Sequence, residues 1–177
     1  PQQDRDDRAA QSGANEKGER ERRRTVAQFG LDVVWAYMGH VQDNAEESVR
    51  RVLDVLEPGA FTYEMDDGSV VSVAISIDKE ARTATVDFTG TSAQLPNNYN
   101  APTAVTHAAV LYVFRTLVDD DIPLNSGCLK PINIIIPEDC LLNPTYPAAV
   151  VAGNVETGQY VTDSLYGALG TMAASQG

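Results

Sequence analysis

The residues best suited to chemistry lie in stretches rich in glycine and asparagine in the second half of the chain. Glu156 follows Gly153 and Asn154 at the predicted start of a helix, where outward-pointing backbone N–H groups and a carboxylate can meet a polar substrate. A glutamate in a first helical turn is also stabilising by itself. For Glu156, a functional and a structural interpretation both stay open.

Cys128 is a further candidate, because it lies in a loop of small residues directly before a predicted strand. Such a loop can expose a nucleophile among backbone donors, and Asn125 precedes the cysteine by three positions. A reactive thiolate needs a base or a positive charge nearby, and the only charge close in sequence is Lys130. A buried, structural cysteine is therefore the favoured interpretation.

The stretch 97–102 is rich in asparagine and contains Asn100. Its amides suit either a cluster of turns or a set of ligands for a polar substrate, and the sequence does not separate the two. The two histidines are far apart: His40 is predicted near the end of a helix, and His107 is predicted to be a hydrogen-bonded core histidine. No metal site follows from this spacing, and the common nucleotide-binding and hydrolase motifs are absent.

The periodicity of apolar residues predicts the elements that position these candidates. Apolar residues recur every three or four positions from Val26 to Val41, which predicts a helix ending at Gly39. A second helix is predicted from Asp43–Asn44 to the stop at Pro58–Gly59. From Phe61 the period becomes two, which predicts an antiparallel meander of three strands, at 61–65, 71–77 and 83–88.

Three more elements complete the predicted α+β fold. Residues 103–118 form a largely apolar stretch that predicts a buried helix. The continuous apolar run 132–136 predicts a strand buried on both faces. Helical spacing returns at 157–174, so the order is two helices, three strands, a helix, a strand and a C-terminal helix.

Composition limits the class of protein. The 177 residues carry 13 basic and 25 acidic side chains, a formal charge of −12 that disfavours nucleic-acid binding. No stretch approaches the roughly 20 consecutive apolar residues of a membrane span. Two cysteines without a disulfide or zinc pattern or a secretory leader favour a cytoplasmic location. Residues 1–24 are polar and predicted to be disordered or an exposed helix, and residues 25–177 are predicted to be one α+β domain.

Several stretches together resemble one known family. They occur in the family's order and are 37–51 (YMGHVQDNAEESVRR), 86–92 (VDFTGTS), 100–106 (NAPTAVT), 122–131 (IPLNSGCLKP) and 147–157 (PAAVVAGNVET). These stretches resemble the hydantoinase B/oxoprolinase family. The chain also begins with Pro-Gln-Gln rather than methionine, so it is interpreted as an internal fragment.

The resemblance implies an internal domain of the B-type subunit, or of the corresponding half of a fused chain, in an ATP-dependent enzyme that opens cyclic amides such as hydantoins and 5-oxoproline. It implies that an A-type partner handles ATP, that the rest of the B-type subunit holds a divalent metal, and that this fragment binds neither and is inactive alone. The alternatives are a non-catalytic assembly module and part of an acetone carboxylase-type enzyme. The residues expected closest to substrate or to the subunit contact are Asn100, Asn125, Cys128, Asn154 and Glu156.

Overall fold

The computed structural model describes residues 2–172, and the chain divides into two units, Pro1–Val41 and Gln42–Gly177. The first unit holds α1 (Gln2–Phe29) and the first turns of α2 (Leu31–Val55). The two helices are separated at Gly30, whose φ of +86° lies in the left-handed region that glycine adopts without strain.

This break corrects the predicted helix boundaries. Gly39 and the Asp43–Asn44 pair lie inside α2, so neither ends or begins a helix, and His40 is not at a helix end. A glycine in a helix interior costs only about 1 kcal/mol relative to alanine, which the rest of the helix can offset. The left-handed backbone at Gly30, in contrast, cannot continue an α-helix.

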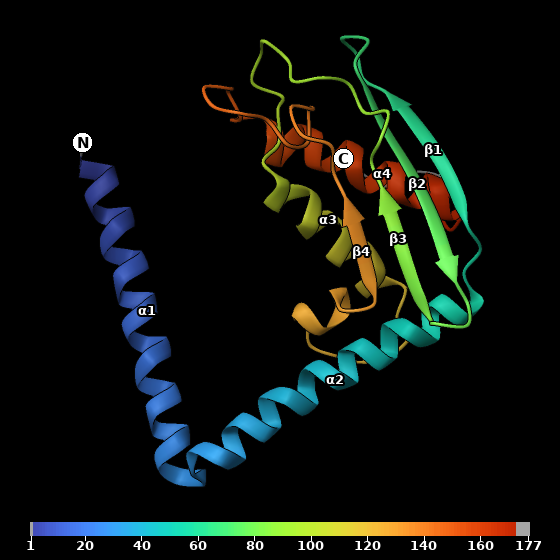
Figure 1. Ribbon diagram of the computed structural model, residues 1–177. Coiled ribbons are helices and arrows are strands. Elements are labelled where there is room, and N and C mark those ends of the chain that lie inside the picture. Colours follow the sequence, from blue (N-terminus) through green and yellow to red (C-terminus); the bar gives the residue numbers. More distant parts are fainter. Residues whose placement is uncertain (1, 173–177) are drawn as a thin grey trace. The chain divides into compact units, whose positions relative to one another are not determined.

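The second unit is built on a four-stranded sheet (Figure 1) with the order β1-β2-β3-β4. The strands are β1 (Gly59–Glu64), β2 (Val70–Asp78), β3 (Thr83–Asp87) and β4 (Ile132–Ile135). The first three form the predicted antiparallel meander, while β4 is parallel to β3. Parallel neighbours need a crossover connection, which α3 (Thr103–Thr116) supplies here. The α+β class and the order of the elements are confirmed.

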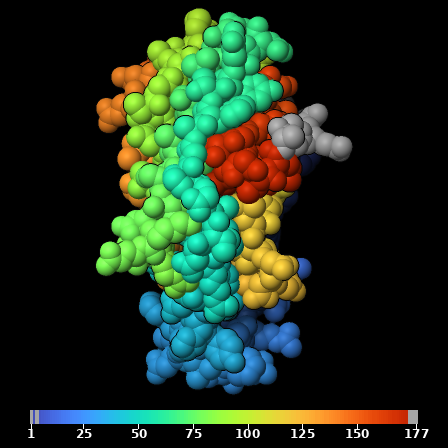
Figure 2. Space-filling view, turned by 90° about the vertical axis from the view of Figure 1, so that its right-hand side faces the viewer, coloured from blue at the N-terminus to red at the C-terminus, as the bar shows by residue number. Residues whose placement is uncertain are grey.

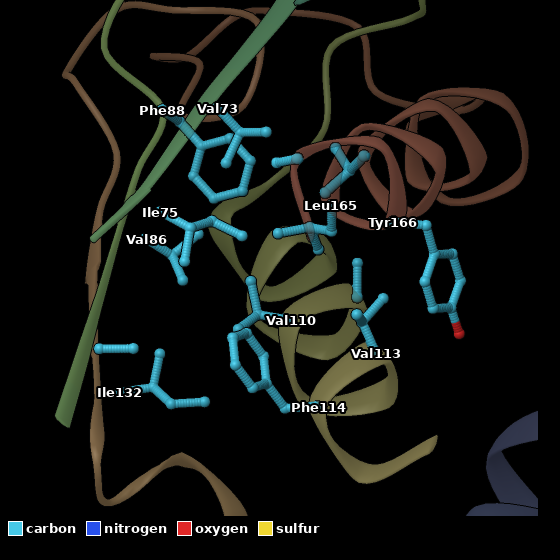
Figure 3. Close-up of a cluster of buried hydrophobic side chains, with 14 of the residues drawn as sticks. Val73, Ile75, Val86, Phe88, Val110, Val113, Phe114, Ile132, Leu165 and Tyr166 are labelled. Atoms are coloured by element: carbon cyan, nitrogen blue, oxygen red, sulfur yellow. The ribbon is translucent and has the colours of Figure 1, made fainter. Parts of the chain in front are cut away.

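Helices α3 and α4 (Gly158–Leu169) cover one face of the sheet and enclose the core (Figure 1). Figure 3 shows the inward side chains of β2 and β3 facing those of the two helices. The residues at its centre, each at most 3% exposed, are Val73, Ile75, Val86, Phe88, Val110, Val113, Phe114 and Leu165. Helix α3 is buried along this face only, because Tyr112 on its other face is 53% exposed.

Among residues 2–172, no helix covers the other face of the sheet. Along β2, Ser72, Ala74 and Ser76 alternate with the buried residues and are partly or fully exposed. The predicted burial of the last strand on both faces is therefore wrong. Strand β4 is at the edge of the sheet, and Ile135 is 40% exposed because the helices pack on one side only.

The second half of α2 packs onto this unit through Ala45, Val49 and Leu53, which are 0% exposed. Its C-terminal end is held by the turn between β2 and β3. The Lys79 ammonium donates hydrogen bonds to the carbonyl oxygens of Leu53 at 3.2 Å and Asp54 at 3.1 Å, groups that a helix end leaves without intrahelical partners. Within residues 2–172, no helix is both long and apolar enough to cross a membrane.

Candidate functional site at the loop end of the sheet

Three loops gather beyond the C-terminal ends of β3 and β4 (Figure 1). They are residues 65–69, 93–101 and 143–157, which we call the loop end. Backbone and side-chain hydrogen bonds join them: the Ala152 N–H donates to the Asn98 carbonyl at 3.0 Å, and the Asn97 amide donates to the Asp67 carboxylate at 3.2 Å. The loop end therefore consists of mutually braced segments.

Asn100 lies at the centre of these contacts and is 0% exposed. Its Oδ1 accepts a hydrogen bond from the Leu95 N–H at 2.7 Å. Its Nδ2 lies 2.9 Å from the Leu95 carbonyl, 2.9 Å from that of Asn97 and 3.1 Å from that of Ala149. The amide is thus fully engaged with backbone groups. Its place in the fold favours a role in positioning the loops over direct contact with a substrate.

The chain enters α4 through a π-helical turn, Gly153–Thr157, that packs directly on this asparagine. A Cβ atom at Gly153 would lie 2.3 Å from the Asn100 carbonyl oxygen, so only glycine fits. Thr157 is buried and its hydroxyl donates to the Tyr99 carbonyl. The side chains of Asn154 and Glu156 are exposed on the same turn. Single π-helical turns recur at functional sites.

Three tyrosines and two acidic residues extend the site from this turn toward β1. The rings of Tyr63 and Tyr160 lie 5.0 Å apart, and Glu156 precedes Tyr160 by one helical turn. Partial burial raises the pKa of the Tyr160 hydroxyl, and the negative charge of Asp66 raises it further. Smaller contributions come from Tyr63, Glu156 and Tyr99. We call these five residues the tyrosine–carboxylate cluster; Figure 2 shows α4 reaching the surface beside β1.

Of this cluster only Glu156 was predicted from the sequence, and the three tyrosines and Asp66 were missed, because the residues come from four separate segments. One signal was available. Tyr160 follows Glu156 at a spacing of four, which places both on the same side of a helical segment. The convergence with Tyr63, Asp66 and Tyr99 depends on tertiary structure.

Asn125 and Cys128 lie away from the loop end. Asn125 directly precedes the short 3-10 helix η1 (Ser126–Leu129), and Cys128 lies within it. Helix α3 begins just after residues 93–101 of the loop end, and η1 follows the C-terminus of α3. The 14 residues of α3 span about 21 Å, which separates η1 from the loop end. The side-chain Oδ1 of Asn125 accepts a hydrogen bond from the Gly127 N–H at 2.8 Å, which caps η1. Cys128 is 0% exposed. The fold therefore groups three of the five predicted residues and separates these two.

The histidines do not form a metal site with these groups. His107 lies on the outer face of α3, exposed, with its Nδ1 2.8 Å from the Thr103 carbonyl oxygen. The predicted core histidine is therefore wrong, because this position points away from the sheet. Among residues 2–172, no three His, Cys, Asp or Glu side chains are grouped closely enough to hold a metal ion.

Comparison with known proteins decides the family. The sequence profile of the hydantoinase B/oxoprolinase family matches residues 1–177. The chain belongs to the hydantoinase B/oxoprolinase family. Among members of this family, the 5-oxoprolinase of Dictyostelium discoideum is 43% identical over 180 residues, which cover 97% of the chain. The chain spans 13–15% of the length of the first curated relatives that it matches.

Two solved structures share the fold of this hydantoinase B/oxoprolinase domain. The ATP-dependent caprolactamase from Pseudomonas jessenii superposes with a TM-score of 0.72 at 21% identity, over 90% of this chain and 29% of the other. The nucleotide-free acetone carboxylase superposes with a TM-score of 0.69 at 15% identity, over 85% of this chain and 22% of the other. Likenesses at this level of identity show the fold alone.

Proposed function

We propose that this chain is an internal domain of the B-type part of an ATP-dependent enzyme that opens a cyclic amide, with 5-oxoproline as the first substrate to test. The observation that carries the proposal is the family match over residues 1–177. It is supported by 43–44% identity, over 97% of the chain, to relatives named 5-oxoprolinase. The fold neighbour named as a caprolactamase agrees with chemistry on a cyclic amide.

The loop end offers the groups that a lactam ring requires. A lactam presents one N–H donor and one carbonyl acceptor, which a carboxylate and a hydroxyl can satisfy respectively. Glu156 is an exposed carboxylate, and Tyr160 lies one turn away. Like any tyrosine, Tyr160 keeps its hydroxyl proton at neutral pH and can donate it to a carbonyl oxygen, and the raised pKa of this hydroxyl acts in the same direction. Within the proposal, these two residues orient the ring, and Asn154 beside them adds an amide.

The same loop end lacks a counterion for an acidic substrate. No lysine or arginine occurs in residues 65–69, 93–101 or 143–157. The carboxylate of 5-oxoproline would therefore be matched by a cation from the remainder of the B-type part or from the A-type partner. The described residues also do not fit a divalent metal or ATP, since they offer neither a ligand cluster nor a phosphate-binding loop. The proposal assigns both to those other components, and the isolated 177 residues are expected to be inactive.

The test is ADP release by the full-length polypeptide that carries this chain, co-expressed with its A-type partner. The panel contains 5-oxoproline, hydantoin, ε-caprolactam, and acetone with bicarbonate. We expect ADP release that depends on 5-oxoproline and is accompanied by stoichiometric glutamate, the product of ring opening. A carboxylated product from acetone would instead assign the acetone carboxylase-type reaction. No substrate-dependent ADP release from an assembled complex would reject all four substrates and favour an assembly role or a substrate outside the panel.

Matched variants then test the loop end within the active complex. Glu156→Gln and Tyr160→Phe are expected to lower kcat at least tenfold without lowering Tm. Their controls are Glu80→Gln, on the exposed turn at the opposite end of β2, and Tyr112→Phe, on the exposed face of α3. Equal activities for all four variants would show that the tyrosine–carboxylate cluster takes no part in the reaction. A change in complex formation at unchanged kcat would assign it to the subunit contact.

A further inference from the structure

The first three turns of α2 carry large apolar side chains over more than half of the helix circumference, an arc of about 200° at about 100° per residue. Among residues 31–41, only Asp32, Gly39 and His40 are not apolar. The largest side chains of this segment are exposed: Trp35 by 72% and Tyr37 by 69%. Leaving one large apolar side chain in water forgoes about 1.5–3 kcal/mol of burial free energy, so this segment as a whole has much to gain from a cover.

The arrangement differs from that of an ordinary surface helix. Successive helical residues are about 100° apart, so the adjacent residues Val33, Val34 and Trp35 already point in widely different directions. The later turns of the same helix instead bury one face and carry charged residues such as Glu47 and Arg51 outside. In residues 31–41 the exceptions Asp32, Gly39 and His40 lie together on one side, and the large apolar side chains cover the remaining arc of about 200°. This arc is roughly twice as wide as the apolar stripe of about 100° that lets a surface helix pack on one neighbour.

We propose that residues 31–41 are enclosed by other parts of the same polypeptide chain, outside these 177 residues. The 5-oxoprolinase of Dictyostelium discoideum matches 97% of this chain but only 14% of its own length lies in the match, so most of such a polypeptide is available as cover. A symmetric dimer is the weaker occupant, because a two-fold contact covers a single face of a helix and leaves part of this arc of about 200° in water. This inference does not depend on which reaction the enzyme performs.

The test compares oxidative footprinting of the full-length polypeptide with that of the 177-residue chain. Trp35 is the only tryptophan in the chain, and Met38, which is 52% exposed, lies one turn away. Met65, at 5% exposed, reports whether the second unit is folded and should be protected in both samples. We expect Trp35 and Met38 to be oxidised at least tenfold more slowly in the full-length polypeptide, at every protein concentration.

Two footprinting results would overturn the inference. Equal oxidation rates of Trp35 and Met38 in both samples would show that nothing covers residues 31–41 in the full-length polypeptide. Protection in the 177-residue chain that grows with concentration would identify a second copy as the occupant. Mass spectrometry of the peptide containing residues 31–41 distinguishes these outcomes without any measurement of activity.

One substitution, made in both contexts, provides an independent test. Trp35→Asp should lower the Tm of the full-length polypeptide by more than 5 °C, because it places a charge inside an apolar environment. In the 177-residue chain the same change should leave Tm within 1 °C, because Trp35 is 72% exposed. Equal shifts in the two contexts, whether large or small, would contradict the enclosure of this segment.

Discussion

Replacing Asn100 by alanine tests whether this residue holds the loop end together. The change removes the acceptor of the Leu95 N–H and the donors that face the carbonyls of Leu95, Asn97 and Ala149. A buried backbone group left without a partner costs about 1–3 kcal/mol. If water entering the vacated space serves some of these groups and two remain unpaired, at about 1.5 kcal/mol each, the loss is about 3 kcal/mol. At about 2–4 °C per kcal/mol, Tm should fall by roughly 6–12 °C.

Urea unfolding of the 177-residue chain, followed by circular dichroism, measures this loss. Asn154→Ala is the matched control, since Asn154 is exposed on the adjoining turn and its removal should change stability by less than about 0.5 kcal/mol. A loss for Asn100→Ala no larger than that of the control would refute the central role of the amide.

An aspartate at the same position adds a test with a defined sign. In Asn100→Asp, a carboxylate oxygen would face three carbonyl oxygens that now lie 2.9–3.1 Å from Nδ2. Burial and this repulsion raise the pKa of the new carboxyl in the folded state above its unfolded value. Stability must then rise as the pH falls through the folded pKa. A variant whose stability relative to wild type does not improve on acidification would contradict this geometry.

Three further predictions concern single contacts. Gly153→Ala should cost at least about 2 kcal/mol in urea unfolding, because its Cβ would lie 2.3 Å from the Asn100 carbonyl oxygen. Thr106→Val should leave the unfolding free energy unchanged or raise it by up to about 1 kcal/mol, since the buried Thr106 hydroxyl has no hydrogen-bond partner among the described residues. The Arg50 hydrogen bond lowers the pKa of Glu46 in the folded state, so this carboxylate stabilises the fold above its unfolded pKa and the contribution is lost as the pH falls through the folded value. Glu46→Gln should therefore flatten the acid side of the stability profile, measured as Tm against pH below the ordinary glutamate range.

The local sequence pattern was sufficient to predict the three-stranded meander but not the position of the break between α1 and α2. The alternation of Val71, Val73 and Ile75 after a turn at Gly68 specifies one buried face by itself, and these residues are buried as predicted. The local sequence does not distinguish Gly30 from Gly39, since a glycine at either position can end a helix. Only the backbone conformation distinguishes them: Gly30 has φ +86°, and Gly39 lies within α2.

The predicted burial of the last strand on both faces was wrong for a related reason. Its run of isoleucines, taken alone, matches a strand covered on both faces. Coverage depends on where the helices pack. Helices α3 and α4 both lie on one side of the sheet, so the other face of the edge strand β4 leaves Ile135 exposed. Sequence periodicity reports which side chains are apolar and cannot report which faces have neighbours.

The candidate site was predictable in part, as a set of loops rich in asparagine and glycine. What the sequence could not supply was the pairing between them. Asn100 and Gly153 are far apart in the sequence, and they touch because their two loops meet beyond the C-terminal ends of β3 and β4. Asn125 and Cys128 belong to an equally suggestive loop, yet α3 carries them to the opposite end of the unit. Loop composition indicates capacity for chemistry, whereas topology decides which loops act together.

The loop end combines a fixed backbone with free side chains, and this combination is what a preorganised site needs. The buried amide of Asn100 and the buried hydroxyl of Thr157 both bond to backbone carbonyls, so they hold the loops without presenting groups to solvent. Asn154 and Glu156 project from the turn that these bonds fix. A catalytic or binding group retains its geometry only when the residues behind it are locked by packing and hydrogen bonds. Under the proposed function, loosening Asn100 should therefore reduce turnover of the complete enzyme even though its side chain is fully buried. If added substrate restores the stability of the variant while its activity stays low, the loss comes from positioning and not from unfolding.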